Sequence, residues 1–154
     1  MPKQIPKIGD VFIVELSNKK YSVGQVVEIT PVLMNSMTCV FYNFNIEERN
    51  DFKESFLVES NVISCLFVTR DLFNRNNWPR IANHTVSMPE NKFPYRNEKR
   101  NGWIGAKIIG SGNVVSFLNA YFGLGDWLEM HDKDYYQKFL LPGMSRPMQR
   151  PDSI

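Results

Sequence analysis

The sequence predicts an α+β domain built on a curved antiparallel β-sheet or a partly open SH3-like barrel, with two or three short helices. At least six runs alternate apolar and polar residues or are rich in β-branched residues, whereas only two segments have a helical pattern. With 154 residues, of which 43% are hydrophobic and 22% charged, the chain is long enough to bury one core. We therefore expect a single domain over residues 1–143 and an extended C-terminal tail over residues 144–154, which lack an apolar period.

The first expected element is a β-hairpin with its turn at residues 17–20. Before the turn, alternate residues point to opposite faces: Phe12, Val14 and Leu16 to one face, Val11 and Ile13 to the other. After the turn, the period of two is continued by Tyr21, Val23, Val27 and Ile29. Gly24 lies inside the second strand, which predicts a bulge or a close backbone approach and hence a curved sheet.

Two further strands are predicted over residues 38–44 and 61–69, and the segment between them is acidic. Residues 46–60 contain five acidic residues against two basic ones, a formal net charge of −3. Such a run most simply forms a solvated loop or a short helix. It also suits a contact surface for a basic partner, because opposite charges speed association. Both interpretations stay open.

Residues 69–77 are expected to form a short helix, with Thr69 as its N-cap and Pro79 closing it. Residues 88–101 are polar and contain proline, which predicts an irregular surface loop.

A second hairpin is expected from residues 103–110 and 113–118, around a glycine-containing turn at residues 110–113. A short helix should then begin near Asp132 and stop at the Pro-Gly pair of residues 142–143.

No motif for a chemical reaction is evident. Residues 110–113 lack the lysine that a phosphate-binding loop requires. The acidic residues and histidine at positions 129–134 lack the spacing of a metal site and better suit the start of a helix. Cys39 and Cys65 lie in apolar strand-like runs, which predicts buried free thiols in a reducing cytoplasm. We expect a protein that is not an enzyme and has no cofactor or metal.

The chain shows no sign of export or membrane insertion. Its N-terminus has no apolar run of signal-peptide length, and its longest nearly apolar run, residues 62–68, is too short to cross a bilayer. We expect a cytoplasmic protein that does not contact a membrane.

A small β-barrel that binds nucleic acid is the alternative. Residues 70–107 contain eight basic residues against three acidic ones, a formal net charge of +5. Basic grooves with aromatic side chains hold phosphates and stack nucleobases. Four of the aromatic residues interleaved with these basic residues are candidates for stacking: Trp78, Phe93, Tyr95 and Trp103. The net charge of the whole chain is only +2, and no RNA-binding signature is present. Nucleic acid is therefore the less favoured partner.

Three stretches carry a resemblance to a known family. Residues 8–16 (IGDVFIVEL) and 19–27 (KKYSVGQVV) contain a Gly-Asp-Val-Phe strand, a turn and a Tyr-x-x-Gly-x-Val pattern. Residues 74–82 (NRNNWPRIA) follow a strand and close a helix on Trp-Pro. Residues 125–143 (GDWLEMHDKDYYQKFLLPG) have an Asp-x-x-Tyr and a Leu-Leu ending. In this order they resemble the immunity protein 26 family of bacterial polymorphic toxin systems, with Asp126-Trp127 in place of the family's Trp-Asp.

This resemblance implies an immunity-protein-like domain: a small cytoplasmic antidote, encoded beside a toxin, that blocks the toxin by binding it. No catalytic residues come with the resemblance. It implies eight signature positions, most of which should be structural: Gly9, Asp10, Phe12, Tyr21, Gly24, Trp78, Pro79 and Trp127.

The resemblance also directs attention to acidic surfaces, because a basic toxin, as many nucleases are, would be steered by carboxylates and anchored by aromatic side chains. The sequence offers two such segments. The expected steering residues are Glu47, Glu48, Asp51 and Glu54, and the expected contacts of the second segment are Asp126, Trp127 and Tyr135. The alternative is that both segments only solvate loops and cap a helix. The sequence makes no prediction of oligomeric state.

Overall fold

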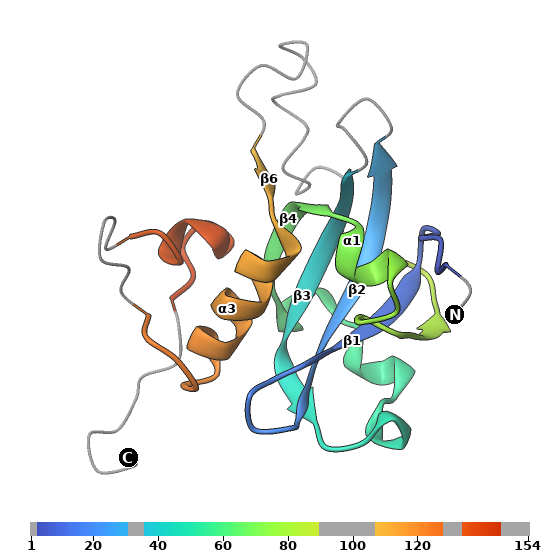
Figure 1. Cartoon of the computed structure of the whole chain (residues 1–154), viewed down its shortest axis with the longest axis horizontal. Coiled ribbons are helices and arrows are strands. Elements are labelled where there is room, and N and C mark those ends of the chain that lie inside the picture. The colour runs from blue at the N-terminus through green and yellow to red at the C-terminus, as the bar shows by residue number, and fades with distance from the viewer. Residues whose placement is uncertain (1–2, 31–35, 90–106, 128–133, 146–154) are drawn as a thin grey trace.

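The computed structural model describes residues 3–30, 36–89, 107–127 and 134–145 (Figure 1). Six strands form one sheet in the order β5-β1-β2-β3-β4-β6. The strands are β1 (Asp10–Glu15), β2 (Tyr21–Thr30), β3 (Ser36–Ile46), β4 (Val62–Thr69), β5 (Arg80–Asn83) and β6 (Ile108–Ile109). The helices are α1 (Asp71–Asn74) and α3 (Ser111–Tyr121), with single 3-10 turns η1 (Arg49–Asp51), η2 (Glu54–Phe56), η3 (Glu59–Asn61) and η5 (Gln137–Phe139).

The sheet is open and mixed. Neighbouring strands are antiparallel except for β4 and β6, which are parallel. The edge strands β5 and β6 lie at opposite ends of the strand order, so the sheet does not close into a barrel. The predicted class, α+β and rich in sheet, is confirmed.

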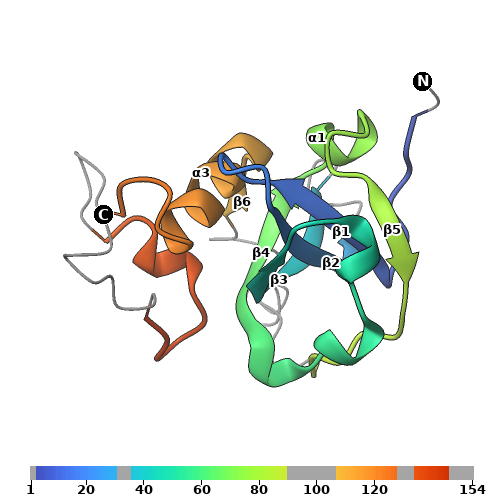
Figure 2. The same cartoon turned by 90° about the horizontal axis from the view of Figure 1, so that it is seen from below.

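The sheet buries both of its faces, because alternate residues of β1 contribute to two separate apolar clusters. Phe12, Val14 and Leu16 belong to the first cluster, and Val11 and Ile13 to the second, as the alternation predicted. Helices α1 and α3 and turn η5 contribute to the first cluster. Figures 1 and 2 show α3 and η5 together on one side of the strands. The turns that follow β3 lie below the sheet in Figure 1.

The predicted face of Ile29 is wrong. Val23 and Val27 belong to the second cluster, whereas Ile29 packs against the first. The register between β2 and β3 shifts between Val26 and Glu28, which makes Val27 an extra residue. A bulge of one residue reverses the alternation beyond it, because side chains of a strand have a period of two.

The predicted strand at residues 113–118 is wrong, because these residues lie in helix α3. Four of its buried residues recur at helical spacing: Val114, Phe117, Leu118 and Tyr121. The glycines on either side of Ser111 suggested a turn between strands, but Gly110 is the N-cap of the helix instead. Residues 103–106 of the predicted hairpin lie outside the described residues.

Helix α1 is shorter than predicted. It covers only Asp71–Asn74, because β4 continues to Thr69 and Asn76 has a positive φ of 65°. The predicted N-cap is wrong, since Arg70 and not Thr69 is the N-cap residue. The chain then enters β5, a strand that was not predicted, since its four residues do not alternate between buried and exposed.

Near the C-terminus, the predicted helix is the single 3-10 turn η5; Asp132 lies outside the described residues. Cys39 and Cys65 are buried free thiols, as predicted, and they belong to different clusters. Burial raises the pKa of both thiols well above the ordinary value of cysteine. Of the predicted loop at residues 88–101, the structure describes only the first two residues, and Met88 is buried.

Candidate partner-binding surface

Six of the eight signature residues lie where β1, β2 and β5 meet, a region called here the β1–β2–β5 joint: Gly9, Asp10, Phe12, Gly24, Trp78 and Pro79. Tyr21 lies at the other end of β1, opposite Glu15, and Trp127 lies outside the joint, after helix α3. Asp10 is its charged centre and is only 1% exposed. The Asp10 carboxylate accepts hydrogen bonds from Arg80 Nη1 (3.0 Å), Asn83 Nδ2 (3.0 Å) and the backbone N–H of Lys7 (2.8 Å). A buried carboxylate needs such partners, since an unpaired one would be costly. Asp10 therefore ties β1 to β5 and to the loop before β1.

Two glycines let backbones approach closely at the joint. Gly9 has a φ of +94°, and a Cβ there would lie 2.6 Å from the carbonyl oxygen of His84. A Cβ at Gly24 would lie 2.6 Å from Cζ of Phe12, and the register against β3 shifts between Ser22 and Gly24. The predicted close approach at Gly24 is confirmed, whereas the extra residues of this irregularity lie in β3, between Phe41 and Asn45, and not in β2.

An aromatic stack fills the joint. Trp78 is 1% exposed and lies parallel to the ring of Phe12, with ring centroids 5.3 Å apart. Phe73 packs edge-on against the same ring at 5.7 Å. The Pro79 carbonyl accepts a hydrogen bond from β1, while Tyr21 is half-buried beside the second cluster. These residues pack and bond within the fold.

Two buried glutamines also hold the joint, and sequence reasoning missed them. Gln25 Nε2 donates to the carbonyls of Gly9 (3.3 Å) and His84 (2.9 Å), and Gln25 Oε1 accepts from the Tyr42 hydroxyl (2.9 Å). Burial raises the pKa of Tyr42 to about 12, so this hydroxyl stays a donor at neutral pH. The signal for Gln25 in the sequence is its place as an uncharged polar residue between pairs of apolar neighbours.

Gln4 fastens the N-terminal segment in the same way. Its Nε2 donates to the carbonyls of Phe73 (3.0 Å) and Trp78 (2.9 Å), and its Oε1 accepts from the backbone N–H of Arg80 (2.9 Å). No pattern around Gln4 in the sequence indicates this role.

The acidic segment, residues 46–60, crosses from β3 towards β4 in single turns of 3-10 helix. The sequence left a loop or a short helix open, and the structure shows short turns joined by extended residues. Glu59 is half-buried, whereas the four predicted steering residues are exposed: Glu47, Glu48, Asp51 and Glu54.

Aromatic residues on the inner side fix the acidic segment to the sheet. Phe56 packs against Phe44 of β3, with ring centroids 5.1 Å apart, and Phe52 packs against Phe56 at 6.4 Å. Leu57 is 7% exposed and belongs to the second cluster. The exposed carboxylates are therefore carried by turns whose other side is anchored in the core.

Polar contacts hold the same turns. The backbone N–H of Glu48 donates to Asp51 Oδ2 at 3.0 Å. Glu54 lies 3.3 Å from Nδ1 of His84, an ion pair only when the imidazole is protonated. Glu47 lies 3.9 Å from Lys20 in an exposed pair, which contributes little to stability. The acidic excess of the segment remains at the surface.

The second predicted contact segment has a different environment. Trp127 is 7% exposed and packs against Phe117 and Tyr136, with ring centroids 6.0 and 5.8 Å away. It lies in the first cluster and offers little surface to a partner. Asp126 is exposed and Tyr135 is half-buried. The two predicted contact segments therefore pack on opposite faces of the sheet.

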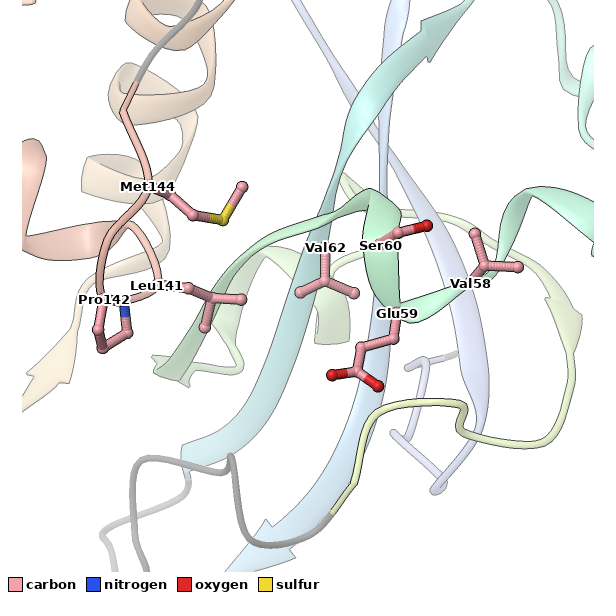
Figure 3. A pocket seen from close by; sticks show the side chains of 7 residues that line it. All are labelled: Val58, Glu59, Ser60, Val62, Leu141, Pro142 and Met144. Carbon is pink, nitrogen blue, oxygen red and sulfur yellow. The ribbon is translucent and has the colours of Figure 1, made fainter.

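The acidic segment meets the C-terminal part of the chain at the start of β4. The backbone N–H of Leu141 donates to the carbonyl of Ile63 at 2.8 Å, and Ser64 Oγ donates to the carbonyl of Phe139. An open groove of about 960 Å³ lies between the two parts. Seven residues line it: Val58, Glu59, Ser60, Val62, Leu141, Pro142 and Met144. Figure 3 shows the side chains of Leu141 and Met144 directed towards Val62.

The basic region of residues 70–107 is described only in part. Its two described aromatic residues, Phe73 and Trp78, are buried, and Arg80 is paired with Asp10. The other aromatic residues named for stacking, Phe93, Tyr95 and Trp103, lie outside the described residues. In the described part of this region, therefore, no exposed aromatic side chain lies among the basic residues.

In the described ranges, no group of three or more His, Cys, Asp or Glu side chains is arranged to hold a metal ion. No helix in those ranges has both the length and the apolar character needed to cross a membrane.

Comparison with known proteins connects this geometry to a family. The family described as Immunity protein 26 matches residues 7–103, a range that contains β1 to β5, the β1–β2–β5 joint and the acidic segment. The third resembling stretch, residues 125–143, lies outside the match. No curated protein and no solved structure matches significantly. Because the match covers more than half of the 154 residues, the chain belongs to the immunity protein 26 family.

Proposed function

We propose that this chain is a non-catalytic immunity protein that binds and neutralises, in the bacterial cytoplasm, the cognate toxin of a polymorphic toxin system. The family match carries the proposal. The roles of the signature residues agree with it, because packing, tight turns and hydrogen bonds account for their positions without a reaction.

The surface we assign to the toxin is the acidic segment. Its exposed carboxylates and net charge of −3 favour a basic partner, such as a nuclease, and raise the rate of association. The turns are anchored by Phe52, Phe56 and Leu57, so little ordering is needed on binding. The adjoining groove supplies apolar area from which an interface can exclude water.

Neutralisation is tested by co-expression with the protein encoded by the adjacent reading frame. Cells that produce that protein alone should stop growing, and cells that also produce this chain should grow. Absence of protection, with both proteins folded and present, would refute the proposed function.

The assigned surface is tested by reversing charge in Glu47→Lys/Glu48→Lys. At low salt the association rate with the toxin should fall by about tenfold, and the difference should shrink near 150 mM salt because screening weakens steering. Asp126→Lys provides a comparison on the opposite face of the sheet. An unchanged rate for the double variant, with a reduced rate for Asp126→Lys, would move the interface to the second segment.

A further inference from the structure

A small hollow lies where β3 extends beyond β4. The two strands pair as far as Tyr42 and Val62, and β3 then continues to Ile46 beside β2 only. The acidic segment turns back across this free edge and leaves a hollow of about 400 Å³. Besides Ile46, it is lined by Asn43, Phe44, Asn45, Asp51, Phe56 and Asn61.

The lining combines three kinds of group that together suit a flat cation. The rings of Phe44 and Phe56 meet at an angle of 63°, so they present differently oriented faces. Asp51 supplies a carboxylate, and three asparagines supply amide groups that can accept hydrogen bonds. No lysine or arginine is among these lining residues. Guanidinium groups stack on aromatic rings and pair with carboxylates, often at the same time.

The hollow is held in shape before any ligand arrives. Asp51 Oδ2 accepts the backbone N–H of Glu48 at 3.0 Å, which orients the carboxylate. Asn61 Nδ2 donates to the carbonyl of Phe56 at 3.0 Å, and the ring of Phe56 is braced by Phe52. A site that is already ordered loses less conformational entropy on binding.

We propose that this hollow receives an arginine side chain of the toxin, an inference that rests on the proposed function. Arginine fits better than lysine because its planar guanidinium can lie against a ring while its N–H groups reach the carboxylate and the amides. The neighbouring exposed carboxylates of Glu47, Glu48 and Glu54 attract a cationic side chain towards this part of the surface.

The first test is Asp51→Asn, measured against the toxin by stopped-flow and surface plasmon resonance. Asparagine keeps an oxygen for the Glu48 N–H and removes the charge from the hollow. The dissociation constant should rise about tenfold or more, mostly through faster dissociation. Glu48→Gln is the matched control. It also removes one negative charge, but Glu48 lies three residues before Asp51 and its side chain does not line the hollow. It should lower the association rate only.

A second variant, Phe56→Leu, removes a ring and keeps an apolar side chain, and its thermal midpoint is measured alongside binding. Surface arginines of the toxin are then replaced by glutamine one at a time. One of them should show a double-mutant coupling with Asp51→Asn and none with Glu48→Gln, and its replacement by lysine should recover little affinity.

The arginine site would be overturned if Asp51→Asn and Glu48→Gln had equal effects on binding, or if no toxin arginine were coupled to Asp51. Protection of cells by the wild-type chain would in that case still support the proposed function. If the wild-type chain neither binds the toxin nor protects cells, both proposals fail.

Discussion

The β1–β2–β5 joint and the acidic segment differ in where they place their carboxylates: the joint buries that of Asp10, whereas the acidic segment exposes most of its own. In the joint, Asp10 and Trp78 are each 1% exposed, and the carboxylate has all its partners inside the fold. In the acidic segment, Glu47 and Glu48 face solvent on turns fixed by the apolar side chains beneath them and by local polar contacts. Both regions lie within the family match. The difference teaches that the signature residues of the joint serve to fold the chain, whereas the residues that we propose for partner binding lie elsewhere.

The largest effect expected from this comparison is the loss of Trp78. Trp78→Ala should lower the free energy of unfolding by about 3–5 kcal/mol, because it leaves a cavity beside Phe12 that the neighbouring rings cannot fill. Urea unfolding followed by circular dichroism measures the change. Trp78→Phe should lose clearly less. A loss below about 1 kcal/mol for the alanine variant would show that the joint is not the stabilising centre.

A single methyl group at Gly24 is expected to have the next largest effect. Gly24→Ala brings its Cβ within 2.6 Å of the Phe12 ring and should destabilise the fold by about 1–3 kcal/mol. Gly112→Ala is the matched control: it lies in helix α3 with no atom within 4 Å of the new Cβ, so it should stabilise the fold slightly.

The explanation for Gly24 is sharpened by a second substitution. In the Gly24→Ala background, Phe12→Leu should cost less stability than it does in the wild-type chain, because the smaller side chain relieves the clash. Additive effects would show that the close approach to Phe12 is not the cause.

A smaller effect is expected outside both regions, at Asp71. Its carboxylate accepts hydrogen bonds from the hydroxyls of Thr69 (2.6 Å) and Ser111 (2.7 Å), which hold its pKa below the usual range of aspartate. The unfolded chain therefore binds this proton more readily, so the stabilisation is present at neutral pH and is lost as pH falls through the lowered pKa.

Asp71→Asn should accordingly cost about 0.5–1 kcal/mol at pH 7, a modest value because the side chain is exposed. The difference from the wild-type chain should shrink below about pH 4. Thermal unfolding at a series of pH values measures it, with Asp126→Asn as the exposed control. A difference that stayed constant down to pH 2 would rule out the carboxylate as its source.

The smallest effect on stability is expected in the acidic segment. Glu47→Lys/Glu48→Lys should leave the thermal midpoint unchanged, because both side chains are exposed and the aromatic anchors are untouched. The same variant should alter toxin association. A large fall in the midpoint would erase the distinction between the two regions, since the carboxylates would then be part of what holds the fold.

Local pattern was enough to predict much of the sheet. The alternation of β1, the apolar runs of β3 and β4 and the irregularity at Gly24 could be recognised because each is encoded within a few neighbouring residues. Helix α3 was missed although its apolar residues have helical spacing, because adjacent valines and flanking glycines gave a competing signal for a hairpin. Strand β5 was missed because its four residues carry no period.

The sequence by itself therefore determined the class of the fold, the two faces of its central strands, the acidity of the segment after β3 and, through its motifs, the family. Only the tertiary structure decided that Trp127 is packed inside, that Asp10 is paired with Arg80, and that Phe44 and Phe56 enclose a hollow beside Asp51. The physical reason is that a period along the chain specifies which side a residue faces. What lies on that side depends on strand register and on segments dozens of residues away.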